Sequence, residues 1–246
     1  MKFSRLFLAA LVCLLASCGP QVAQVHRGTE ARILAMGDSM MAWHSTSQRS
    51  IPDAVERELR VPVESRAISG AHIIYGLPVT GAMGMRIANQ YVPGDWDWIV
   101  VNGGGNDLWL GCGCSRCEKR MNKMISKDGH RGEIPRLVST LRDTGAQVVY
   151  LGYLRSPGAW SIIEHCKDEG QELEKRIGRL AELIDGVHFL SIADLVPRGD
   201  RSYHAADMIH PSMKASAEIG HLVAELIQNT QASNTAGAKP VKPAGD

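Results

Sequence analysis

The sequence lacks any strong imbalance of charge. Its 246 residues include 27 Lys and Arg and 26 Asp and Glu, which gives a formal net charge of +1. Proteins that bind nucleic acids usually present a basic surface, so this composition gives no indication of a nucleic-acid partner. The sequence also has no cluster of Asp, Glu and His with the spacing of a catalytic metal site. We therefore expect no nucleic-acid partner and no cofactor.

A phosphate-binding loop and internal repeats are missing as well. The glycines at 103–105 are not followed by a lysine at P-loop spacing, which argues against nucleotide binding. No repeat is visible, and nothing in the chain separates two hydrophobic cores. A chain of 246 residues is long enough for one domain of about 200 residues with a sizeable core. We expect a single domain over residues 31–229.

The amino terminus has no hydrophobic run long enough for a membrane-spanning anchor. Lys2 and Arg5 precede an apolar stretch from Leu6 to Ala16, which is typical of a cleaved signal peptide. Residues 15–19, Leu-Ala-Ser-Cys-Gly, resemble the lipobox of bacterial lipoproteins, in which the cysteine becomes the lipidated first residue. We expect a signal peptide over 1–18, lipidation of Cys18, a linker over 19–30 and a periplasm-facing membrane location. An ordinary secretory signal is the alternative.

Four cysteines remain after Cys13 is removed and Cys18 is lipidated, namely Cys112, Cys114, Cys117 and Cys166. An even number in an oxidising compartment favours two disulfides, for which three pairings exist. A link between Cys112 and Cys114 is sterically unfavourable, so we expect one bridge from the 112–117 loop to Cys166. The alternative is a four-cysteine zinc site, because Cys-x-Cys-x-x-Cys is a plausible ligand cluster.

Five short apolar segments predict strands, at residues 33–36, 61–68, 98–101, 147–151 and 187–190. They alternate with helical patterns near residues 51–59, 86–90, 118–127, 134–145, 173–184 and 215–226. This alternation predicts a three-layer α/β/α sandwich with a five-stranded parallel sheet. Residues 230–246 contain too few apolar side chains to pack, and we expect a disordered tail there.

Polar residues follow several of these strands, at the sheet edge where α/β proteins bind ligands. The motifs are Gly37-Asp38-Ser39-Met40, Gly70, Gly104-Gly105-Asn106-Asp107 and Asp207-Met208-Ile209-His210-Pro211. Together and in this order they resemble the SGNH hydrolases, or GDSL esterase/lipase family, over about residues 31–228. The resemblance implies a flavodoxin-like fold. Met40 stands where the family has leucine, and the similar volume predicts no chemical consequence.

The resemblance implies a role for each motif. Ser39 corresponds to the nucleophile, His210 to the general base and Asp207 to the carboxylate that orients it. The oxyanion donors would be the backbone N–H groups of Ser39 and Gly70 and the side-chain amide of Asn106. The spacing fits independently, because a carboxylate three residues before a histidine in a turn can reach its Nδ1 and leave Nε2 for the serine proton.

The predicted function is therefore serine-dependent hydrolysis of acyl esters through an acyl-enzyme on Ser39. Acetyl or short-chain esters of cell-envelope glycans are the expected substrates. One alternative is an O-acyltransferase acting on an envelope glycan, and another is a non-catalytic envelope-binding lipoprotein. The loops over 71–84 and 108–130 are expected to shape the pocket. Asp38 is expected to hold its turn, and Trp43 and Trp109 to line the pocket or lie in the core.

Overall fold

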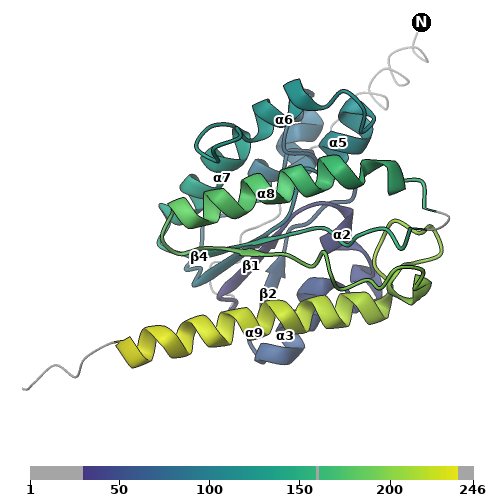
Figure 1. The fold of residues 1–246 in the computed structure, drawn as a ribbon. Coiled ribbons are helices and arrows are strands. Elements are labelled where there is room, and N and C mark those ends of the chain that lie inside the picture. The colour runs from purple at the N-terminus through teal and green to yellow at the C-terminus, as the bar shows by residue number, and fades with distance from the viewer. Residues whose placement is uncertain (1–29, 159–160, 238–246) are drawn as a thin grey trace, which may run out of the picture.

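The computed structural model describes residues 30–158 and 161–237. It is a five-stranded parallel sheet with the strand order β2-β1-β3-β4-β5, covered by helices on both faces (Figure 1). The strands are β1 (Ile33–Met36), β2 (Val63–Ser65), β3 (Trp98–Val101), β4 (Gln147–Leu151) and β5 (Val187–Leu190). The α/β/α sandwich expected from the alternating pattern is confirmed.

The helices are α2 (Ser39–Ala42), α3 (Ile51–Leu59), α4 (Pro78–Thr80), α5 (Gly105–Cys112), α6 (Glu118–Met124), α7 (Glu133–Arg142), α8 (Lys167–Leu183) and α9 (Met213–Gly237). Short 3-10 turns occupy η1 (Ser45–Ser47), η3 (Ile87–Gln90), η4 (Glu164–Cys166) and η5 (Arg201–Tyr203), and η2 (Gly81–Met85) is a π turn. Helix α3 begins as the sequence predicts, with reciprocal hydrogen bonds between Ser50 and Asp53. In the described part of the chain, we find no helix with both the length and the apolar character to cross a bilayer.

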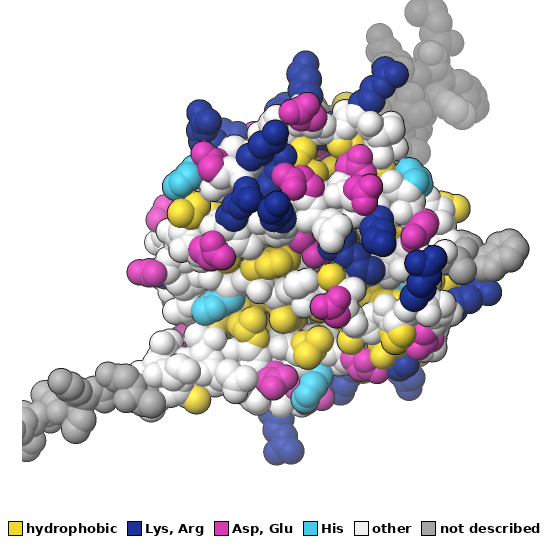
Figure 2. Space-filling model, viewed as in Figure 1, with side chains coloured by type: hydrophobic (Ala, Val, Ile, Leu, Met, Phe, Trp, Pro, Cys, Tyr) yellow, Lys and Arg dark blue, Asp and Glu magenta, His cyan; other side chains and the backbone are white. Residues whose placement is uncertain are grey.

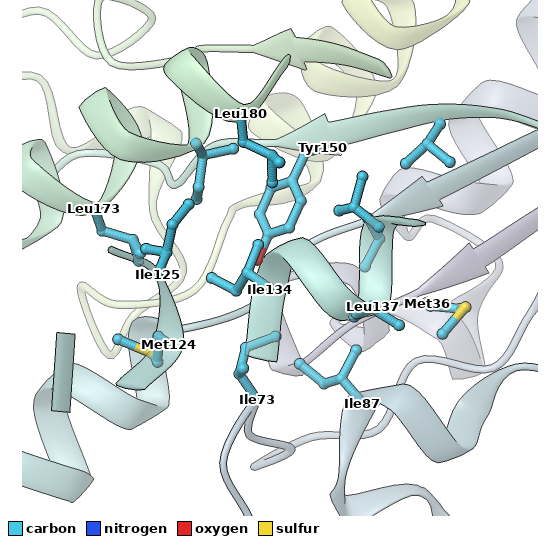
Figure 3. Packing of buried hydrophobic residues seen from close by; sticks show 14 of the residues in the cluster. Met36, Ile73, Ile87, Met124, Ile125, Ile134, Leu137, Tyr150, Leu173 and Leu180 are labelled. Atoms are coloured by element: carbon cyan, nitrogen blue, oxygen red, sulfur yellow. The ribbon is translucent and has the colours of Figure 1, made fainter. Parts of the chain in front are cut away.

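Alternate strand residues face opposite sides of the sheet and build two hydrophobic cores. Leu34 and Met36 of β1 belong to the core beneath α7 and α8, which also contains Tyr150 (Figure 3). Ile33 and Ala35 point to the other core, which α3 and α9 cover. Because both faces are covered, the inner strands β1 and β3 are apolar throughout rather than alternately polar.

Helices α3 and α9 lie side by side along the lower face of the sheet in Figure 1. Gly220 of α9 makes the close approach possible, because a Cβ at this position would overlap Ala54. On the side of the molecule shown in Figure 2, Lys and Arg side chains lie among Asp and Glu side chains.

Several predicted boundaries are wrong. Strand β2 covers only Val63–Ser65 rather than 61–68, because it is an edge strand paired with β1 alone. Helix α6 ends at Met124, and the segment near 86–90 is a 3-10 turn that starts at Ile87. The expected disordered tail is wrong for residues 230–237, which continue helix α9. The signal peptide with Cys18, most of the linker and residues 238–246 lie outside the described residues.

The four remaining cysteines form two disulfides, Cys112–Cys117 and Cys114–Cys166. The expected link between the 112–117 loop and Cys166 is confirmed. The zinc alternative is wrong for this structure, because a sulfur held in a disulfide cannot serve as a thiolate ligand. The longer bridge joins the loop after α5 to the start of α8.

Candidate active site

Ser39 is the first residue of α2, directly after the sharp turn that ends β1. Glycine is required at position 37, because a Cβ there would lie 2.8 Å from Oδ1 of Asn102. Met40 and Met41 are buried and anchor the short helix, whereas Ser39 is partly exposed. The turn therefore holds the Ser39 hydroxyl at the carboxyl edge of the sheet, as the sequence predicts.

Asp38 holds this turn from inside the protein, as expected. Its carboxylate is 2% exposed and accepts hydrogen bonds from the Met40 N–H at 3.0 Å and the Tyr153 hydroxyl at 2.5 Å. Burial raises the pKa of Asp38 above its ordinary value, and the bonds from Tyr153 and Met40 oppose this rise. The Tyr153 oxygen in turn accepts the N–H of Gly105 at 2.9 Å. Tyr153 therefore joins the turns that follow β1 and β3.

Asp207 and His210 lie in the loop before α9 and are hydrogen bonded. Nδ1 of His210 lies 2.6 Å from Oδ2 of Asp207, and the N–H groups of Ile209 and His210 donate to Oδ1 at 3.0 Å each. Because an ionised carboxylate only accepts hydrogen bonds, Nδ1 carries the proton and Nε2 is left as an acceptor. Partial burial acts to raise the pKa of Asp207, but these hydrogen bonds outweigh it and lower the pKa.

Trp43, the residue that follows α2, stacks on the ring of His210. The two ring centroids are 3.8 Å apart and the planes differ by 5°. The backbone N–H of Trp43 donates to the carbonyl oxygen of Ser39 at 2.9 Å. The sequence left Trp43 either in the pocket wall or in the core, and neither alternative anticipated its contact with His210.

Asn106 lies in the first turn of α5, beside the chain that contains Gly70. Its Nδ2 donates to the carbonyl oxygen of Ala71 at 2.9 Å, which leaves the second amide hydrogen for another acceptor. The peptide between Ala71 and His72 is thus held next to Asn106. Buried Asp107 supports this arrangement, since its carboxylate accepts the N–H groups of Ile73 at 2.7 Å and Ile74 at 2.9 Å.

A cavity of about 370 Å³ brings Ser39, Asn106 and His210 together. Neither Gly70 nor Asp207 lines this cavity. Asp207 is connected to it through its hydrogen bond with Nδ1 of His210. The walls come from residues 153–158, 163–171 and 193–198, which lie after β4 and β5. No residue of 71–84 lines the cavity, so the prediction that this loop shapes the pocket is wrong. Of residues 108–130, only Leu108 and Trp109 of helix α5 lie on the wall.

The cavity wall includes functional candidates that sequence reasoning missed. The apolar part of the wall contains Leu154, Ile163 and Val196, together with Trp109, for which the pocket wall was one of the two predicted places. Arg155 also lines it and forms an ion pair with Glu174 at 2.6 Å. Burial raises the pKa of Glu174, and the charge of Arg155 opposes this rise. The one available sequence clue was that a long irregular loop follows β4, at the same edge of the sheet as Ser39.

Comparison with known proteins gives a family and a set of similar folds. The GDSL-like Lipase/Acylhydrolase family profile matches residues 35–217. No curated protein sequence matches the chain. Among solved structures, a Streptococcus pneumonia protein assigned as a platelet activating factor is 15% identical, with a TM-score of 0.59 over 84% of this chain and 86% of that one.

Two further solved structures carry names that refer to ester cleavage. A protein from Agrobacterium tumefaciens assigned as an arylesterase is 19% identical, with a TM-score of 0.56 over 81% of this chain and 99% of that one. A family two carbohydrate esterase from Clostridium thermocellum is 18% identical, with a TM-score of 0.53 over 82% of this chain and 64% of that one. At these identities the likeness concerns the fold, whereas the profile match covers most of the domain. The chain therefore belongs to the GDSL-like lipase/acylhydrolase family, that of the SGNH hydrolases.

Proposed function

We propose that this chain is a serine ester hydrolase that forms an acyl-enzyme on Ser39. The observation that carries the proposal is the shared cavity of Ser39, Asn106 and His210, with Asp207 hydrogen bonded to the far side of the imidazole. A serine hydroxyl is a weak nucleophile unless a base takes its proton. His210 has the required free acceptor, because Asp207 fixes the tautomer with the proton on Nδ1.

In the proposed first step, Oγ of Ser39 attacks the carbonyl carbon of the ester while Nε2 of His210 takes the hydroxyl proton. The carbonyl oxygen becomes an oxyanion. The backbone N–H of Ser39 and the unused Nδ2 hydrogen of Asn106, both on the cavity wall, would donate hydrogen bonds to it. The N–H of Gly70, the third donor that the family resemblance implies, belongs to a residue outside that wall. The tetrahedral intermediate collapses, the bond to the leaving oxygen breaks, and the imidazolium of His210 returns the proton to the departing alcohol.

In the second step, a water molecule replaces the alcohol. His210 takes a proton from the water, whose oxygen attacks the acyl carbon on Ser39. The new intermediate expels Oγ, which recovers its proton from His210. The products are a carboxylic acid and free enzyme. Asp207 stays ionised throughout and stabilises the imidazolium that forms in each half of the cycle.

The cavity supports a small substrate with an apolar part. A volume of about 370 Å³ lies within the range of about 300–1,000 Å³ that small-molecule sites usually have. Trp109 offers an aromatic face on the wall, of the kind that packs against an acyl chain or a sugar ring. We propose acetyl or short-chain esters of glycans as the substrates. The carbohydrate esterase among the similar folds is compatible with this choice.

The test is a hydrolysis screen across acetyl, butyryl and long-chain esters and acetylated glycans, with Ser39→Ala as the blank. A fluorophosphonate probe should label wild type at Ser39 and leave Ser39→Ala unlabelled. Equal rates for the two proteins, or no labelling of wild type beside a reactive control esterase, would contradict the proposal. Product analysis with an added glycan acceptor separates hydrolysis from acyl transfer, since transfer gives an acylated acceptor instead of free acid.

We further propose that the chain is exported and lipidated at Cys18, facing the periplasm. The two disulfides support an oxidising compartment, because such bonds rarely persist in the cytosol. Cells grown with an alkyne-labelled fatty acid should incorporate the label into wild type. The variant Cys18→Ala should remain unlabelled and leave the membrane fraction. Equal labelling of both proteins would count against the assignment of Cys18.

A further inference from the structure

We propose that Trp43 is a positioning residue that fixes the plane of the His210 imidazole against the nucleophile. This inference rests on the proposed function of His210 as the general base. The carrying observation is the stack itself, with centroids 3.8 Å apart and planes only 5° from parallel. At this separation the indole contacts the imidazole face to face, so the ring cannot tilt toward Trp43 without a steric clash.

Asp207 alone does not fix the imidazole plane. A single hydrogen bond at Nδ1, 2.6 Å long, holds one edge of the ring but tolerates combined rotations about the Cα–Cβ and Cβ–Cγ bonds that tilt the ring. Such a tilt changes where Nε2, at the opposite edge, points within the cavity shared with Ser39. The indole face removes this freedom on one side. Asp207 therefore sets where Nδ1 points, and Trp43 sets where Nε2 points.

The same short segment carries both the nucleophile and the stacking ring. The Trp43 N–H donates to the Ser39 carbonyl at 2.9 Å, and Ala42 donates to the Asp38 carbonyl at 3.1 Å. These bonds fix the spacing between the serine and the indole within one helical turn. A ring positioned by Trp43 is thus positioned relative to Ser39, although His210 comes from a distant loop.

His44 makes a second contact with the loop that carries His210. Its Nε2 lies 3.1 Å from the Pro211 carbonyl oxygen and donates to it, since a carbonyl only accepts. His44 has a φ of +66°, a left-handed conformation that non-glycine residues rarely adopt. Strained backbone of this kind persists where surrounding contacts hold it, often beside functional groups. Trp43 and His44 therefore contact two adjacent residues of the loop before α9, His210 and Pro211.

The stack also suits the charge that the reaction creates. His210 becomes an imidazolium when it takes the serine proton, and a cation beside an aromatic face is stabilised by the negative charge of the ring face. The benefit is larger for the charged ring than for the neutral one. Trp43 thus favours the state that follows proton transfer over the resting state.

The kinetic test compares Trp43→Leu, which removes the flat face, with Trp43→Phe, which keeps one. We expect Trp43→Leu to lower kcat about 10- to 100-fold with little change in KM, the cost of a misplaced catalytic group. Trp43→Phe should retain most of the wild-type kcat. Trp96→Phe is the matched control, because Trp96 lies before β3 at the opposite edge of the sheet. Thermal melting of each variant separates loss of the fold from loss of position.

Fluorescence tests the contact independently of activity. A protonated imidazole quenches the emission of an indole that it touches, so Trp43 emission should fall as His210 gains a proton. The chain has five tryptophans, and the difference between wild type and Trp43→Phe isolates the contribution of Trp43. This difference should change with pH in the wild-type background and stay flat in the His210→Gln background.

Any of three results would overturn the inference. The first is a kcat for Trp43→Leu that equals the kcat of Trp96→Phe. The second is an equal loss of kcat in Trp43→Leu and Trp43→Phe, since the flat face would then be irrelevant. The third is an emission difference whose pH dependence survives in His210→Gln. Failure of the proposed function looks different, because fluorophosphonate would then leave Ser39 unlabelled in wild type while the emission difference still titrates.

Discussion

The hydroxyl group of Tyr153 donates a hydrogen bond to Oδ2 of Asp38 at 2.5 Å. The bond links the loop after β4 to the turn that presents Ser39. Because Asp38 is 2% exposed, its carboxylate depends on protein donors rather than on water.

We expect Tyr153→Phe to lower both stability and turnover. Hydrogen bonds to a charged group contribute about 1.5–3 kcal/mol, and the loss here leaves a buried carboxylate short of a donor. Urea denaturation measures the change. Tyr150→Phe is the matched control, since its buried hydroxyl donates to the Gly103 carbonyl, a neutral acceptor, at 2.9 Å. A larger loss of stability in Tyr150→Phe than in Tyr153→Phe would contradict the importance of the link to Asp38.

We expect Asn106→Ala to lower kcat about 10²- to 10³-fold, the usual cost of losing one oxyanion donor. Asn89→Ala is a close control. Asn89 also donates from Nδ2 to a backbone carbonyl, that of Gly81, at 2.9 Å, but it does not line the cavity. Initial rates on an acetyl ester, with melting curves for both proteins, measure the effect. Similar rates for the two variants would argue against an oxyanion role for Asn106.

The two disulfides should differ in what they stabilise. Cys114–Cys166 closes a loop with a sequence separation of 52, and its loss should cost about 4 kcal/mol in the chain-entropy estimate. Cys112–Cys117 closes a loop with a separation of 5 and should cost about 2 kcal/mol. Cys166 lines the cavity, whereas Cys112 and Cys117 do not. The double variant Cys114→Ser/Cys166→Ser should therefore also raise KM, and Cys112→Ser/Cys117→Ser should not. Denaturation and kinetics on both double variants test this, and an equal KM in the two would contradict it.

Stability should fall when the pH drops below about 6.5, partly because of His204. This side chain is 6% exposed, and burial lowers its pKa from the ordinary value of 6.5, although Asp207 opposes the shift. Below 6.5 the unfolded chain binds a proton at His204 that the folded chain does not, so acid favours unfolding. The effect is absent above 6.5 and grows as the pH falls toward the lowered folded pKa.

Melting temperatures at pH 7.5 and pH 5 give the measurement. His204→Leu should lose less stability between the two pH values than wild type. His221→Gln is the control, because the His221 side chain is 62% exposed and should leave the difference unchanged. A pH dependence that is identical in wild type and His204→Leu would exclude His204 as a cause.

The sheet and the places of the candidate motifs on it could be predicted because they depend on local patterns. Strands β1, β3, β4 and β5 have the predicted bounds. For β1, β3 and most of β4 the reason is a compact apolar run buried on both faces, which leaves little choice of register. The spacing of Asp207 and His210 likewise predicted a hydrogen bond within one turn, which the structure contains. Edge strand β2 was overextended, because its apolar residues continue after its pairing with β1 has ended.

The cavity wall and the stack on His210 could not be predicted in the same way. Residues 153–158, 161–166 and 193–198 include irregular loops, and no periodicity indicates which of their side chains face inward. Contact between Trp43 and His210 joins residues far apart in the chain, so it depends on how two loops meet in space. Similarly, the cysteine spacing favoured one bridge to Cys166 but left open which of the clustered cysteines makes it.

The separation between the proposed reacting groups and most of the cavity wall has an evolutionary consequence. Ser39, Asn106 and His210 are held by the turns after β1 and β3 and by the loop before α9, whereas most of the wall follows β4 and β5. Exchanges within 153–158 or 193–198 can therefore diversify which molecules are accepted while the proposed reaction is inherited unchanged. A library restricted to these two loops is the natural place to select new ester preferences on this scaffold.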